Sequence, residues 1–204
     1  MDTSPPGPRE EQWEPLSLEQ VQQKLATVAA PWWVAGGRAL DLFVGHETRS
    51  HNDVDVAILR RDQQAFRDTL GGWDAQIAHE GAFIPWKRGD TITAPEHHEV
   101  WARETSSGPW RIEFLLEEST GARWMYRRDP RIGMNVSDLG RRDERGIPYL
   151  RPEVVLLYKS KDARGVDETD LLYVLPRLDP AQRGWLFATI YTADPTHRWL
   201  ERLK

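Results

Sequence analysis

Two aspartates separated by one residue, Asp53 and Asp55, form the clearest chemical pattern in the chain. They open the segment Asp53–Leu59, which alternates for four residues and then becomes continuously apolar, as a strand does when one end is exposed and the other is buried. On a strand both carboxylates project from one face, whereas Val54 and Val56 point into the core. Like charges so close together need neutralising cations, and paired oxygen donors suit Mg²⁺. The alternative is an exposed Asp-x-Asp that is solvated and binds no metal.

A glycine pair, Gly36 and Gly37, precedes the aspartates and lies between a predicted strand and a predicted helix. The strand is the apolar run Trp32–Ala35, and the helix begins at Ala39. Because glycine has no side chain, such a turn lets a phosphate approach backbone N–H groups at the positive end of a helix. A tight turn without any ligand is the alternative. In combination, the two patterns predict a phosphate cradle and a metal site on consecutive elements.

The surrounding sequence predicts the elements that position these residues. Four prolines among the first fifteen residues predict a flexible tail over residues 1–15. Ser17 and Gln20 form a capping box at the start of a helix over residues 17–30. Further elements are expected as a helix over residues 62–70 and strands over residues 73–78, 99–104 and 110–117. The last two strands flank Ser106–Pro109, whose turn residues predict a hairpin.

The pattern becomes helical from Pro152 onward. The sequence therefore predicts an α+β protein, with a small mixed β-sheet core over residues 16–150 that is flanked by helices, and a C-terminal helical region over residues 151–204. With 204 residues, 39% of them hydrophobic, the chain is long enough to bury a core. It has no cysteine, so any metal must bind to oxygen or imidazole. Without a secretory or membrane signal, the expected location is the cytoplasm.

A family resemblance is carried by Trp32–Asp41 and Thr48–Asp55. These segments hold a Trp-Trp pair, Gly-Gly followed by Ala-Leu-Asp, and an Arg-x-His-x-Asp-x-Asp sequence. They resemble the polymerase-β-like nucleotidyltransferases, and most of all the branch of aminoglycoside 2''-adenylyltransferases and lincosamide nucleotidyltransferases. The resemblance implies a nucleotidyltransferase fold and enzyme. It also implies that two Mg²⁺ ions are cofactors and that ATP or another nucleoside triphosphate is the co-substrate.

The same resemblance implies roles for single residues. Asp53 and Asp55 would be catalytic metal ligands, and Gly36 and Gly37 would bind phosphates. Members of the superfamily place a further Asp on a neighbouring strand as the general base. Here the strand near Trp110–Leu116 offers Glu113, one methylene longer, whose alternative is a salt bridge with Arg111.

A second match is the segment Arg151–Lys161, followed by Asp167 and Asp170. It resembles the Pro-Glu-x-x-x-x-x-Lys helix of the same branch, and also the tail of abortive-infection nucleotidyltransferase toxins. The resemblance implies that Lys159 binds a nucleotide phosphate, and the alternative is an ordinary exposed lysine. The two aspartates either orient the lysine or cap the next helix.

The predicted reaction moves a nucleoside monophosphate, AMP from ATP, to a hydroxyl of a small acceptor such as an aminoglycoside-like antibiotic. A cationic acceptor suits several acidic residues near the predicted sheet, namely Glu96, Glu99, Glu117 and Glu118. Residues 123–151 hold eight Arg against four acids, a local charge of +4, within a chain of formal charge −5. That segment favours an alternative, a toxin-like enzyme acting on tRNA or protein. A nucleotide-binding module without turnover is a third reading, and no membrane partner is expected.

Overall fold

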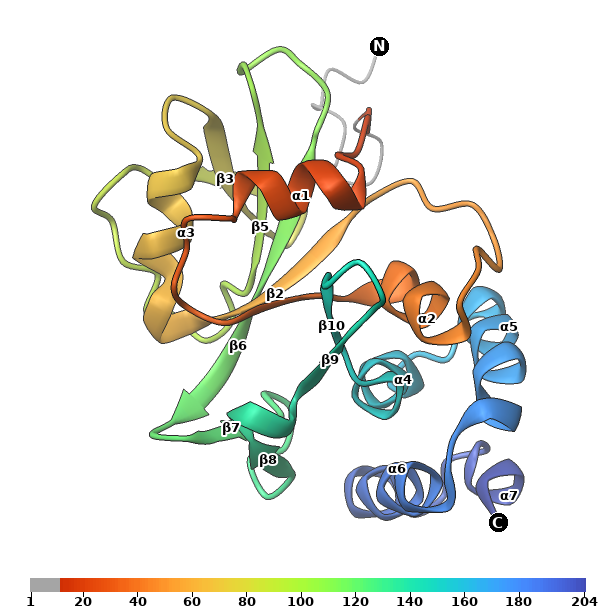
Figure 1. Cartoon of the computed structure of the whole chain (residues 1–204). Helices are drawn as coiled ribbons and strands as arrows, with labels where there is room; N and C mark the ends of the chain where they lie inside the picture. Colours follow the sequence, from red (N-terminus) through yellow and green to blue (C-terminus); the bar gives the residue numbers. More distant parts are fainter. Residues whose placement is uncertain (1–11) are drawn as a thin grey trace, which may run out of the picture. The chain divides into compact units, whose positions relative to one another are not determined.

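The computed structural model describes residues 12–204 and contains two compact units (Figure 1). Of the described residues, one unit holds 12–32 together with Asn52–Glu118, and the other holds Trp33–His51 together with Ser119–Lys204. These units differ from the predicted segments 16–150 and 151–204, so a domain boundary near residue 150 stays a prediction. Most of the predicted tail, residues 1–11, lies outside the described residues.

The first unit is built on a mixed sheet whose strands lie in the order β4-β3-β5-β6-β2. Its elements are α1 (Leu18–Lys24), β2 (Asp55–Leu59), α3 (Gln63–Thr69), β3 (Asp74–His79), β4 (Ala82–Pro85), β5 (Glu99–Arg103) and β6 (Ile112–Thr120). Strand β2 pairs parallel with β6, whereas the pairs β6–β5, β5–β3 and β3–β4 are antiparallel. The antiparallel pairing of β5 and β6 confirms the predicted hairpin.

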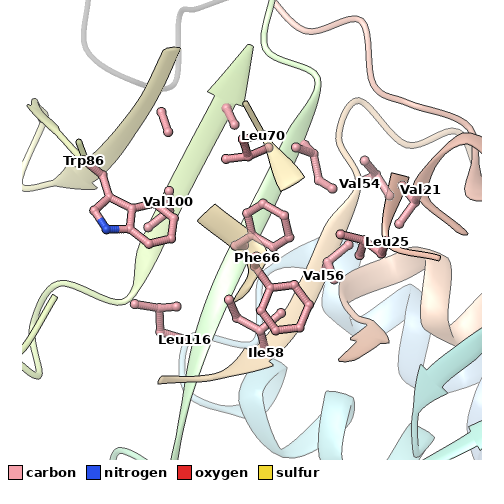
Figure 2. Packing of buried hydrophobic residues seen from close by; sticks show 14 of the residues in the cluster. Val21, Leu25, Val54, Val56, Ile58, Phe66, Leu70, Trp86, Val100 and Leu116 are labelled. Atoms are coloured by element: carbon pink, nitrogen blue, oxygen red, sulfur yellow. The ribbon is translucent and has the colours of Figure 1, made fainter. Parts of the chain in front are cut away.

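One face of this sheet is apolar and forms the core of the unit, as Figure 2 shows. Alternate residues of β2 and β6, such as Val56 and Phe114, are completely buried there. Helices α1 and α3 contribute Val21 and Phe66 to the same cluster, and the rings of Phe66 and Phe114 lie 6.0 Å apart. Because the apolar residues occupy this face, the alternating polar residues of the same strands must lie on the opposite face.

The second unit combines short strands with most of the helices. Its elements are β1 (Trp32–Val34), α2 (Gly36–Val44), β7 (Arg123–Met125), β8 (Gly133–Asn135), β9 (Gly140–Arg142), β10 (Pro148–Leu150), α4 (Pro152–Ser160), α5 (Gly165–Val174), α6 (Pro180–Ala193) and α7 (Leu200–Leu203). Strand β10 pairs parallel with β1 and antiparallel with β9, and β7 pairs antiparallel with β8. The mixed sheet pairings and the helices α4–α7 confirm the predicted α+β class with a C-terminal helical region.

Local sequence signals explain where several helices begin. The predicted capping box of α1 is present, because the Ser17 Oγ accepts from the Gln20 N–H and the Gln20 side chain accepts from the Ser17 N–H. Pro152 occupies the first turn of α4, as predicted. Helix α1 is shorter than predicted, because the chain after Lys24 continues in turns such as the bond from Val28 N to Leu25 O. Among the described residues, none of the helices has the length and apolarity needed to cross a membrane.

Candidate catalytic and nucleotide-binding sites

Three carboxylates meet on the polar face of the first unit's sheet. Asp55 begins β2, Asp53 precedes that strand, and Glu113 lies on β6 as the direct Cα partner of Asp55. One carboxylate oxygen from each residue lies within 4.8 Å of the others. Val54 and Val56 are fully buried in the core, so the predicted division of this segment into a carboxylate face and a core face is confirmed. The parallel pairing of β2 and β6 therefore creates the cluster.

The pairing also resolves the orientation of Glu113. Arg111 is 3.4 Å from a carboxylate oxygen of Glu14 and 3.8 Å from one of Glu104. No salt bridge between Arg111 and Glu113 is found among the residues that the structure describes, so the predicted alternative partner is wrong. Glu113 instead faces the two aspartates and is 8% exposed.

Crowding of like charges dominates the electrostatics of this cluster. Burial raises the pKa of Glu113 well above its ordinary value, and the charges of Asp55, Glu99 and Asp53 raise it further. The side chain of Trp101 acts in the opposite direction and lowers this pKa. Three oxygen donors that repel one another at this separation fit a hard divalent cation, which removes the repulsion when it binds. The residues present therefore suit the predicted Mg²⁺.

The glycine pair lies in the second unit, at the start of α2. The sequence predicts a turn there and a helix that begins at Ala39, so the helix begins earlier than predicted. Gly36 has φ +59°, a left-handed conformation that glycine adopts without strain. The N-cap residue, Ala35, provides no side-chain cap for the helix. An uncapped helix start with a bare backbone leaves N–H groups available to an anion.

Side chains from the loop after α2 pack tightly on this helix start. The His51 Nε2 lies 2.6 Å from an Asp41 carboxylate oxygen, and the other oxygen of Asp41 accepts from the backbone N–H and the hydroxyl of Thr48. Asp41 thus ties the loop to its own helix. In the sequence, Asp41 and Thr48 stand only as parts of the family motif, and the fixed spacing of that motif is the signal that could have paired them.

Lys159 belongs to a buried network of ions in the second unit. Its Nζ lies 2.9 Å from Asp167 and 2.9 Å from Asp170. Arg49 binds Asp170 with two nitrogens, at 3.0 and 3.3 Å. Burial opposes ionisation of Asp170, but hydrogen bonds and charges from Arg49 and Lys159 outweigh it and lower its pKa. Lys159 is therefore no ordinary exposed lysine.

The two predicted roles of the aspartates are both present. Asp167 and Asp170 hold Lys159, and Asp167 also accepts from the backbone N–H of Arg164 in a capping box of α5. Through Asp170 and Arg49, the lysine connects to the glycine pair, because an added Cβ on Gly37 would lie 2.5 Å from the Arg49 Nη2. The structure thus brings Gly37 and Lys159 into one network. It brings Asp53, Asp55 and Glu113 together in the first unit.

Replacing Gly37 by alanine tests this packing. The new Cβ would lie 2.4 Å from the His51 Cε1, and the ring cannot yield without disturbing its contact with Asp41. We expect Gly37→Ala to lower the free energy of unfolding by about 1–3 kcal/mol, as overpacking does, in a urea titration. The control is Gly72→Ala, where an added Cβ would meet nothing within 4 Å. Equal stability of the two variants would show that the helix start is not tightly packed.

Solved structures share this fold. The lincosamide antibiotic adenylyltransferase LnuA, in its lincomycin-bound crystal structure, superposes with a TM-score of 0.54 at 15% identity, covering 79% of this chain and 98% of that one. The solution structure of the antibiotic-resistance factor ANT(2'')-Ia gives a TM-score of 0.51 at 13% identity, covering 91% and 93%. At these identities the likeness concerns the fold.

The chain shares the fold of LnuA and of ANT(2'')-Ia. Residues 17–80 match the family model of aminoglycoside-2''-adenylyltransferase, which confirms the predicted resemblance. Comparison with curated protein sequences gives no match.

Proposed function

We propose that the protein transfers a nucleoside monophosphate, AMP from ATP, to a hydroxyl group of a small acceptor such as an aminoglycoside-like antibiotic. The observation that carries the proposal is the cluster of Asp53, Asp55 and Glu113, whose oxygens lie within 4.8 Å of one another. Such a cluster is the arrangement of hard donors that a metal-assisted phosphoryl-type transfer needs. The cytoplasm is the location that we propose for this enzyme.

The three carboxylates have different tasks in this proposal. Asp53 and Asp55 hold Mg²⁺, as two ions, and orient the triphosphate toward the acceptor. When bound, the cations supply charge neutralisation on the phosphates and lower the pKa of the acceptor hydroxyl. Glu113 accepts the proton of that hydroxyl as general base. Burial raises its pKa, and a carboxylate with a raised pKa is a stronger base than an ordinary one.

Gly36, Gly37 and Lys159 bind the triphosphate in this proposal. The uncapped start of α2 offers backbone N–H groups, and the helix dipole favours an anion there. Lys159 is 11% exposed and is held by two carboxylates, so its ammonium is fixed in place before a phosphate arrives. Arg49 shares one of these carboxylates and would stabilise the departing pyrophosphate alongside the lysine.

Charges on the polar sheet face support a cationic acceptor. Glu99 and Glu117 lie on the same face as Glu113, because Glu99 pairs with Leu115 and strand residues alternate. Glu118 is on the opposite face, where the Arg60 Nε lies 2.7 Å from its carboxylate. An amine-bearing antibiotic would place cations near Glu99 and Glu117, which favours a role in antibiotic resistance.

Few observations support the two alternative functions, a toxin-like enzyme acting on tRNA or protein and a nucleotide-binding module without turnover. Two of the eight arginines between residues 123 and 151, Arg131 and Arg145, pair with Asp129 and Asp143 at 2.6 and 2.8 Å. Such pairs reduce the basic surface that tRNA would need. The reading as a nucleotide-binding module without turnover rested on doubt about Glu113, and that residue lies with the two aspartates.

An acceptor screen tests the proposal. Purified protein with Mg²⁺ would receive ATP, GTP, CTP or UTP together with aminoglycosides, lincosamides or total tRNA, and released pyrophosphate would be measured. We expect release with ATP that depends on an amine-bearing antibiotic. Label appearing in tRNA would favour the toxin-like alternative, and tight Mg-ATP binding without release for any acceptor would favour the module without turnover.

A further inference from the structure

Four aromatic rings form a cluster beside the carboxylates, and the proposed mechanism does not use them. They are Trp13, Phe83, Trp101 and Trp110. The Trp101 ring lies at the centre, 4.9 Å from Trp13, 5.5 Å from Phe83 and 5.6 Å from Trp110, measured between ring centroids. Contacts from three sides fix the orientation of the Trp101 indole.

Trp101 lies directly opposite Glu113. The two residues are Cα partners in the antiparallel pairing of β5 and β6, so their side chains project from the same face. The Trp101 Nε1 is buried and has no hydrogen bond of ordinary geometry. A buried N–H without an acceptor is costly, so this donor needs a partner. The indole nevertheless acts on Glu113, whose pKa it lowers.

The segment before α1 holds this cluster in place. Trp110 N donates to Gln12 O at 2.9 Å, and Glu14 N donates to Trp110 O at 3.0 Å. Leu16 N donates to Arg111 O at 2.8 Å, which continues the pairing toward Glu113. Residues 12–16 therefore run beside the start of β6 and place Trp13 against Trp101. This segment precedes residues 17–80, which match the family model.

We propose that Trp101 is a positioning residue for Glu113, that its indole N–H donates to the Glu113 carboxylate when the cluster holds a cation, and that Trp13 fixes the indole in the orientation this bond requires. The catalytic part of this inference rests on the proposed function. The inferred interaction itself is a hydrogen bond from the indole to one carboxylate of the metal cluster, and hydrogen bonds to metal-binding groups tune metal affinity as well as activity.

Trp101→Phe keeps an aromatic ring at this position but removes the indole N–H. Trp110→Phe is the matched control. The Trp110 Nε1 is also buried without a partner, but Trp110 is not opposite Glu113. Mn²⁺ binding would be measured by calorimetry on the protein without nucleotide, and kcat and KM in the pyrophosphate assay. We expect Trp101→Phe to weaken Mn²⁺ binding by about 10-fold and to lower kcat by about 10-fold, with the KM for ATP within about twofold of wild type. Trp110→Phe should change neither.

The outcomes separate this inference from the proposed function. If Trp101→Phe binds Mn²⁺ as tightly as wild type, or if Trp110→Phe weakens binding equally, the positioning role is overturned. A wild-type protein that binds Mn²⁺ but releases no pyrophosphate with any acceptor contradicts the proposed function and leaves the Mn²⁺ comparison valid. Should Trp101→Phe fail to fold, Trp13→Ala replaces it, since it keeps the indole N–H and removes one packing partner. It should weaken Mn²⁺ binding in the same direction, and unchanged binding would contradict the proposal.

Discussion

Asp55→Asn should reduce nucleotidyl transfer by about 10³-fold while the fold stays intact. The substitution keeps the size of the side chain and removes one of the negative charges that hold the cations, which supply several kcal/mol of transition-state stabilisation. Asp55 is only partly buried and its charge raises the pKa of Glu113, so its loss relieves repulsion in the metal-free protein. The measurements are pyrophosphate release at saturating ATP and the thermal unfolding midpoint with and without Mg²⁺.

The expected pattern differs between activity and stability. Mg²⁺ should raise the unfolding midpoint of wild type and have little effect on Asp55→Asn, because a ligand stabilises only the state that binds it. Asp53→Asn should behave alike. The control is Asp68→Asn, which alters an aspartate that is 53% exposed and paired with Arg88 on the surface. Wild-type rates of release from an Asp53→Asn, Asp55→Asn double variant would rule out the assignment of this cluster.

The sequence was sufficient for the elements with strong local signals. The capping box at Ser17, the first-turn proline at Pro152 and the hairpin through Ser106–Pro109 follow from a few neighbouring residues, and the structure contains all three. Helix boundaries were less accurate. The glycine pair reads as a turn in sequence, but a residue at φ +59° can open a helix, so α2 begins at Gly36.

Features that depend on which strands are neighbours could not be predicted from the sequence. In β6, alternation puts residues 111, 113 and 115 on one face but does not say which face that is. The parallel register with β2, which pairs Asp55 with Glu113, decides it. The same holds for Trp101, whose importance appears only because β5 pairs it with Glu113. The short strands β4 and β7–β10 lack the length to give a periodic signal.

The pairing of β2 with β6 explains why one substitution can probe both chemistry and folding. Glu113 is buried among carboxylates because the register requires it, and this burial raises its pKa. The burial and the repulsion among the carboxylates lower the stability of the folded state whenever no cation is bound. A site that binds a divalent cation gains affinity from the repulsion it relieves, so the metal-free protein and the metal-bound protein should respond to pH differently.

Glu113→Gln should lower kcat by about 10²–10⁴-fold, the range expected for loss of a general base. The amide keeps the shape of the carboxyl but cannot take the proton of the acceptor hydroxyl. Glu14→Gln, at a glutamate that is 59% exposed, is the surface control and should retain activity. Wild-type kcat in Glu113→Gln would assign the proton transfer to another group.

The same variant should change how stability depends on pH. Since the pKa of Glu113 is raised in the folded state, the folded protein binds more protons than the unfolded chain between the ordinary Glu value of about 4.3 and the folded-state pKa of Glu113. Stability from this group is therefore complete below the ordinary value and is lost as pH rises through the folded-state pKa. Without Mg²⁺, urea unfolding should show wild type losing stability over this range and Glu113→Gln losing less. If stability depended on pH in the same way in the two proteins, neither burial nor the charges of Asp53 and Asp55 would raise the pKa of Glu113 in the folded state.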